Sequence, residues 1–87
     1  MTHRMELVIV ERTFEQPADI ESVQEAGKRA KWCLDLHNVT FVRSYVSNDR
    51  RRMMCVYEAP DAESVRIVNS TAKLPFDRVW SASLLQP

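Results

Sequence analysis

The sequence predicts an α+β fold of the ferredoxin-like class, a four-stranded antiparallel sheet with two helices on one face. Three observations lead to this prediction. Strand-like and helix-like segments follow the order β-α-β-β-α-β, an aspartate stands at the start of each helix-like segment, and the first and third strand segments are apolar on both sides. This order places those two strands at the centre of the sheet, where both faces are covered.

The first part of the chain supplies one strand and one long helix. Residues 5–14 are rich in Val, Ile and Leu and predict a strand. Asp19 can cap the following segment, and a helix is expected over residues 19–36. Trp32 lies almost opposite the apolar stripe of this helix, with Leu36 beside it. We expect Trp32 to be an isolated surface side chain, or to contact a second chain or the chain's own tail.

The middle of the chain predicts a β-hairpin. Residues 39–46 alternate in the manner of a strand, residues 47–49 (Ser-Asn-Asp) supply turn chemistry, and residues 52–59 run back as the third strand. Both faces of this returning strand are largely apolar. It is therefore expected beside the first strand.

The last part of the chain predicts a second helix and a final strand. Asp61 is the expected cap of a helix over residues 61–73, which ends before Pro75 because proline cannot continue it. Residues 77–85 then predict the fourth strand. Two helices can cover only one face of the sheet, so we expect a second copy of the chain to cover the other face, or a pocket to form there.

Length and composition narrow the class of protein. The 87 residues, 45% of them hydrophobic, predict a single domain over residues 1–87. Twelve basic and twelve acidic residues cancel, so nucleic acid is not an expected partner. No segment is typical of a signal peptide or a membrane span, so we expect a cytoplasmic protein without membrane contact. The two cysteines, Cys33 and Cys55, lack metal-type spacing and are expected as reduced, buried thiols.

The segments SYVSNDRRRMMCVYEAPDAESVR and LPFDRVW resemble domain-of-unknown-function family 4242, which includes a nickel-binding protein. The likeness spans nearly the whole chain. It implies a ferredoxin-like subunit that dimerises, similar to dimeric α/β-barrel proteins. In the nickel-binding branch, the resemblance places histidines at positions that match Asn69 and Lys73 here. An amide is a weak ligand and an ammonium group repels a cation, so we expect no metal site and no cofactor, with nickel implied by the family alone.

Three residues are candidates for proton transfer. Glu58 interrupts an apolar strand face. If its carboxylate is buried it could act as a general base, and the alternative is a solvated carboxylate at the end of the strand. His37 stands at the end of the first helix, either as a capping imidazole or as a base. Tyr45 on the second strand is the third candidate.

Five further residues are candidates for ligand binding. If the faces of the hairpin strands coincide, three of them line one polar-aromatic pocket together with Tyr45, or simply pack across the strands. Arg43 could hold an anion through two parallel N–H groups. A tryptophan of the last strand could form the floor of an apolar cavity, and an amide lies in a polar row on the second helix. The five are Arg43, Cys55, Tyr57, Asn69 and Trp80.

The sequence thus predicts a homodimer that binds a small organic molecule in a pocket lined by the sheet. A cofactor-independent enzyme of the dimeric α/β-barrel kind, such as an isomerase, cyclase or monooxygenase, is the alternative on fold analogy. Binding of nickel or another divalent metal is a second alternative, suggested by the family resemblance.

Overall fold

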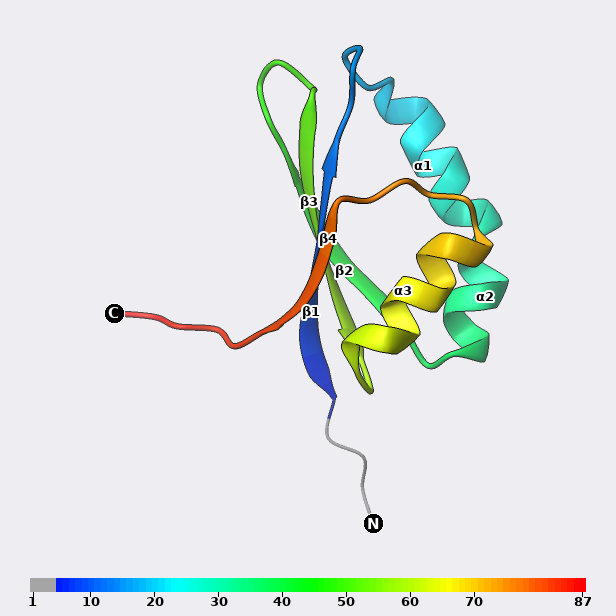
Figure 1. Cartoon of the computed structure of the whole chain (residues 1–87), viewed down its shortest axis with the longest axis vertical. Coiled ribbons are helices and arrows are strands. Elements are labelled where there is room, and N and C mark those ends of the chain that lie inside the picture. Colours follow the sequence, from blue (N-terminus) through cyan, green and yellow to red (C-terminus); the bar gives the residue numbers. More distant parts are fainter. Residues whose placement is uncertain (1–4) are drawn as a thin grey trace.

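The computed structural model describes residues 5–87 and confirms the predicted fold class. One layer is a four-stranded antiparallel sheet, and the other is a layer of helices on a single face of that sheet (Figure 1). The strand order is β2-β3-β1-β4, so the first and third strands are central, as predicted. The elements are β1 (Glu6–Thr13), α1 (Ile20–Arg29), α2 (Lys31–Leu36), β2 (Thr40–Val46), β3 (Arg52–Ala59), α3 (Ala62–Thr71) and β4 (Arg78–Ala82).

Both aspartates that the sequence suggested as helix caps have this role. Asp19 accepts a hydrogen bond from the backbone N–H of Glu21 at 3.2 Å, and Asp61 accepts one from the backbone N–H of Ser64 at 2.7 Å. The hydrogen bonds from Ser64 lower the pKa of the Asp61 carboxyl group. Each carboxylate satisfies an amide that the first helical turn leaves without a partner.

The single helix predicted over residues 19–36 is wrong, because the chain forms two helices that meet at Ala30. Ala30 at the junction and Cys33 of the second helix are both buried, 3% and 1% exposed. Gly27, one turn earlier, is a weak helix former and makes the interruption less costly. Trp32 is 63% exposed on the outer side of α2, as its position on the helical wheel predicted.

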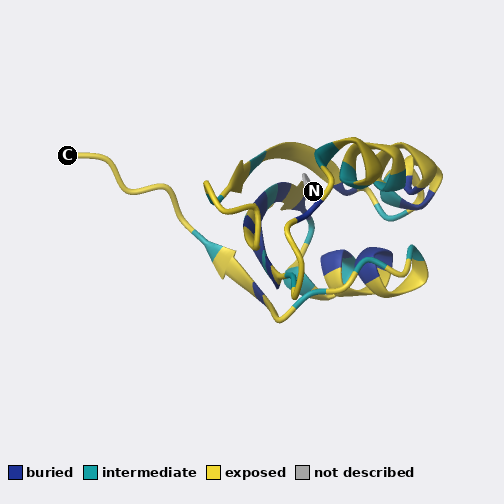
Figure 2. Cartoon of the chain, turned by 90° about the horizontal axis from the view of Figure 1, so that it is seen from above, coloured by how far each residue is buried: buried dark blue, intermediate teal, exposed yellow. Residues whose placement is uncertain are grey.

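The last strand is also shorter than the predicted residues 77–85. Ala82 pairs with Leu7, and β1 begins one residue before Leu7, so the sheet offers almost no partner beyond Ala82. The following residues extend away from the sheet on the side opposite the helices (Figures 1 and 2). We call residues 83–87 the arm.

The core lies between the sheet and the helices, and elements of both layers carry buried residues (dark blue in Figure 2). Its largest fully buried side chains include Val8 and Val10 of β1, and Val65 and Val68 of α3. Cys33 and Cys55 are free and buried. No helix among residues 5–87 has the length and apolar character needed to cross a bilayer.

Candidate functional site

The face of the sheet that the helices leave uncovered carries the candidate site, and we call it the open face. In an antiparallel pair, residues directly opposite each other point to the same side. Ile9 of β1 is opposite Val56 and Trp80, and Glu11 is opposite Met54 and Arg78. The open face thus has an apolar centre beside a row of charged groups. Its side chains are Leu7, Ile9, Glu11, Thr13, Thr40, Arg43, Tyr45, Arg52, Met54, Val56, Glu58, Arg78, Trp80 and Ala82.

Two depressions open on or beside this face. The larger has a volume of about 650 Å³ and lies along β4, where Trp80, Arg78 and Arg66 are among its lining residues. The smaller, about 280 Å³, lies over the ends of β1, β2 and β3 and is lined in part by Tyr45 and Met54. Glu11 and Asp77 line both depressions. These two carboxylates therefore mark the place where the depressions meet.

Glu11 is half-buried in the middle of this region. Its Oε2 accepts a hydrogen bond from Nε1 of Trp80 at 2.8 Å, which fixes the indole beside the carboxylate. Asp77 accepts a hydrogen bond from the Thr13 hydroxyl at 2.8 Å. Among residues 5–87, Glu11 forms no ion pair. A carboxylate has about four acceptor sites, so most of the capacity of Glu11 is free for a ligand.

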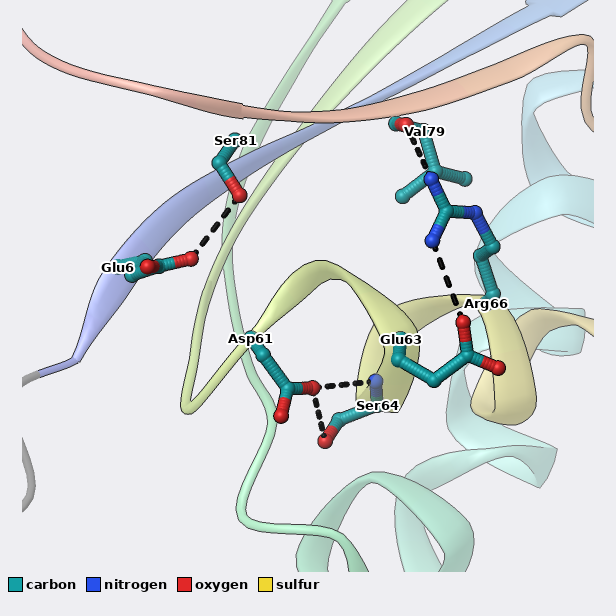
Figure 3. Close-up of polar contacts among 7 residues, drawn as sticks. All are labelled: Glu6, Asp61, Glu63, Ser64, Arg66, Val79 and Ser81. Atoms are coloured by element: carbon teal, nitrogen blue, oxygen red, sulfur yellow. Dashed lines mark hydrogen bonds and ion pairs between the residues drawn. The ribbon is translucent and has the colours of Figure 1, made fainter.

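Arg66 of α3 lines one side of the larger depression. Its guanidinium donates to the backbone carbonyl of Val79 at 3.0 Å and pairs with Glu63 at 3.2 Å (Figure 3). Val79 lies in β4, an outer strand of the sheet. Arg66 therefore satisfies a carbonyl on this strand and connects it to the helix layer.

A bulge in β2 separates residues that the sequence analysis grouped. Phe41 is opposite Tyr57 and Arg43 is opposite Val56, so Val42 is an extra residue without a partner. The rings of Phe41 and Tyr57 lie 5.7 Å apart on the helix side. After the bulge, Arg43 and Tyr45 point to the open face. Arg43 and Tyr45 therefore do not line one pocket with Cys55 and Tyr57, because the bulge reverses the alternation of β2.

The predicted ligand-binding residues consequently lie on two faces. Arg43 and Trp80 are on the open face, with Trp80 at the larger depression. Cys55, Tyr57 and Asn69 are buried on the helix side, where the Ser44 hydroxyl donates to Sγ of Cys55 at 3.1 Å. Sheet and side chains separate the two groups.

The three candidates for proton transfer do not meet. Tyr45 and Glu58 are both exposed on the open face, but Tyr45 is opposite Met54, four residues from Glu58 along β3. That separation is about 13 Å. His37 is the residue that ends α2, in the helix layer. Only Tyr45 borders a depression.

A buried polar cluster on the helix side was not predicted as a unit. Arg12 is 6% exposed, and its guanidinium donates to Asn69 Oδ1 at 2.6 Å, to the Tyr57 hydroxyl at 3.2 Å and to the Pro75 carbonyl at 2.8 Å. Asn69 in turn donates to the Val65 carbonyl at 2.8 Å. The signal in the sequence is that Arg12 continues the alternation of Val8 and Val10, the core-facing side chains of β1.

Burial raises the pKa of the Tyr57 hydroxyl, and the nearby positive charge of Arg12 opposes part of that effect. The three acceptors of Arg12 are all neutral, so the cluster holds a positive charge without a carboxylate partner. Within residues 5–87, every buried polar side-chain atom has a hydrogen-bond partner. This cluster is closed and fully bonded, which suits a structural role better than ligand binding.

The residues around Asn69 do not fit a nickel ion. Asn69 is fully buried and its carbonyl oxygen is occupied by the Arg12 guanidinium, whose charge repels a cation. Lys73, the other position implied by the resemblance, carries an ammonium group and has a φ of 58°. Residues 5–87 contain no group of three or more His, Cys, Asp or Glu side chains placed to hold a metal. Within the described residues, Asn69 and Lys73 therefore do not supply the nickel ligands that the resemblance places at these positions.

Comparisons with known proteins identify the family. The model of the nickel responsive protein SCO4226-like family matches residues 9–81. The crystal structure of SCO4226 from Streptomyces coelicolor A3(2) has a TM-score of 0.81 at 18% sequence identity, and the alignment covers 92% of this chain and 99% of that one. No curated protein matches significantly. The number 4242 from the resemblance is not confirmed, but its association with nickel agrees with the family model. The chain belongs to the SCO4226-like family of nickel responsive proteins.

Proposed function

We propose that this protein is a homodimer that binds a small organic molecule on the open face, next to Glu11. The observation that carries the proposal is that two depressions meet at Glu11 and Asp77, with Trp80 hydrogen-bonded to Glu11. Ligand sites are typically apolar hollows with a few converging polar groups. Trp80, Met54 and the carboxylate of Glu11 provide this combination.

A second copy supplies what a single chain lacks, which is a cover for the open face. Tyr45, Met54 and Trp80 are exposed there although they are large and apolar or aromatic. Burying them against an identical face would stabilise the pair by the hydrophobic effect, and an interface of this kind requires only one gene product. The smaller depression would then be enclosed between two sheets, and the larger would open at the β4 edge of the interface.

The dye anilinonaphthalene sulfonate tests the site, because its fluorescence rises in an apolar environment. Its aromatic rings can stack on Trp80, while Arg78 and Arg52 of the lining residues can meet the sulfonate. We expect Trp80→Ala to weaken dye binding by roughly tenfold, as expected for the loss of one aromatic contact.

Trp32→Ala is the matched control, since Trp32 is an equally large side chain that is exposed on the other side of the molecule. It should leave dye binding unchanged. Equal weakening by both substitutions, or no effect of either, would remove the open face as the binding site. Sedimentation equilibrium of the unmodified protein tests the dimer separately, and a monomer at all concentrations would overturn it.

Nickel binding is a second candidate, favoured by the family match. Because residues 5–87 contain no suitable group of ligands, a site made by these residues would need side chains from two copies. If nickel binding is the function, calorimetric titration of the full chain with nickel should give a saturable heat signal. A titration without heat would remove this candidate.

A further inference from the structure

The arm, residues 83–87, exposes apolar side chains that have no contact surface within their own chain. Leu84 is 73% exposed and Leu85 is 92% exposed. The arm leaves the sheet after Ala82 and projects from the open-face side, away from all three helices (Figures 1 and 2). Exposing two adjacent leucines in water is unfavourable. The arm is therefore suited to a surface outside its own fold.

We propose that the arm of one copy docks on β2 of a second copy, at the bulge formed by Phe41 and Val42. This inference rests on the proposed dimer, in which two open faces are stacked. Stacked sheets lie about 10 Å apart, and five extended residues span roughly 16 Å. An arm that starts on the open side thus crosses the gap and reaches the edge of the partner sheet.

The two edges of the sheet differ, and the difference selects β2. At the β4 edge, Arg66 already occupies the Val79 carbonyl and Arg78 adds a second positive charge. At the β2 edge, Phe41 and Val42 are both exposed, and Val42 has no partner on β3. Leucine side chains gain more from covering the apolar edge.

The stacking also permits this contact. A two-fold axis that runs parallel to the strands, midway between two stacked sheets, exchanges the two edges of the sheet. With the order β2-β3-β1-β4, it places β4 of one copy over β2 of the other. The arm continues β4, so each arm then emerges beside the partner's bulge, and the dimer contains two identical contacts.

The test is the dimer dissociation constant, measured by sedimentation equilibrium for two matched double variants. Leu84→Asp with Leu85→Asp should weaken the dimer by about a hundredfold, since two apolar contacts are lost. Ser83→Asp with Gln86→Asp adds the same charge to the same arm and should leave the dissociation constant within about threefold of the unmodified value. The arm runs away from the helices in both figures, and circular dichroism checks that both variants are folded.

A charge exchange tests the docking site on β2. Val42→Arg alone should weaken the dimer. In the triple variant, the arginine at position 42 can pair with the two aspartates on the partner's arm, so the dimer should bind at least about tenfold more tightly than with the two aspartates alone. A lack of recovery would overturn the placement on β2.

The remaining outcomes separate the two proposals. If the dimer persists unchanged with Leu84→Asp and Leu85→Asp, the arm inference fails and the proposed dimer stands. If the unmodified protein is a monomer at every concentration, the proposed dimer fails and the arm inference fails with it.

Discussion

Glu11 and Arg12 are neighbours in β1, yet they belong to two faces of the sheet with different properties. Arg12 points to the helices, is 6% exposed and donates to three acceptors. Glu11 points to the open face, is half-buried and accepts one hydrogen bond, from Trp80. The helix side has its polar groups satisfied within the chain, whereas the open face retains acceptor capacity. We therefore expect stability to depend on the first face and the proposed binding on the second, and the following predictions test that division.

The largest expected effect is the loss of Arg12. Arg12→Met removes the donor shared by Asn69, Tyr57 and Pro75 and leaves buried acceptors without a partner. We expect the free energy of unfolding to fall by about 3 kcal/mol, measured by urea denaturation at neutral pH. Glu11→Gln, one residue away, should change it by less than about 0.5 kcal/mol. Similar losses for the two substitutions would show that the faces do not divide stability and binding in this way.

Tyr57→Phe should have an intermediate effect. It removes one acceptor of the buried guanidinium while keeping the ring that packs against Phe41. The expected loss is about 1 kcal/mol in the free energy of unfolding, the usual contribution of a single hydrogen bond. Tyr45→Phe is the control on the open face, because the Tyr45 side chain is exposed and its loss of a hydroxyl should leave stability unchanged.

Tyr57 also predicts that the free energy of unfolding depends on pH in the alkaline range. Burial raises the pKa of Tyr57 above the usual value of 10.0, so the unfolded chain loses this proton more readily than the folded one. The contribution of Tyr57 is therefore fully present below about pH 10 and is lost as the pH rises toward the folded-state pKa. In urea denaturation across this range, Tyr57→Phe should reduce the fall in stability, and an identical fall in both proteins would contradict the prediction.

The fold could be predicted from the sequence because its signals are local or periodic. Asp19 and Asp61 mark helix starts through hydrogen bonds that span two and three residues. The doubly apolar strands led to the correct central pair β1 and β3. The break at Ala30 escaped prediction because the apolar spacing continues through it.

The candidate site was harder to predict, since it depends on register and on contacts between distant residues. Val42 fits the alternation of a regular strand, so nothing local marks it as the extra residue of a bulge. That one residue moved Arg43 and Tyr45 to the open face. Arg12 and Asn69 meet across 57 positions of sequence, and Glu11 and Trp80 across 69. The pairing of strands with each other and with α3 creates these contacts.

The smallest effect is expected at Trp80, on the open face. Trp80→Phe removes the hydrogen bond to Glu11 but keeps an aromatic ring on the open face, and Trp80 is 41% exposed. Water can replace the indole as a donor to Glu11, so the free energy of unfolding should fall by about 0.5 kcal/mol or less. Trp32→Phe, in the exposed turn of α2, gives the reference value for a surface tryptophan in the same urea experiment. If Trp80→Phe lowered the free energy of unfolding as much as Arg12→Met, the hydrogen bond from Trp80 to Glu11 would stabilise the fold itself. The open face would then be part of the folding core and not a surface kept free for a ligand.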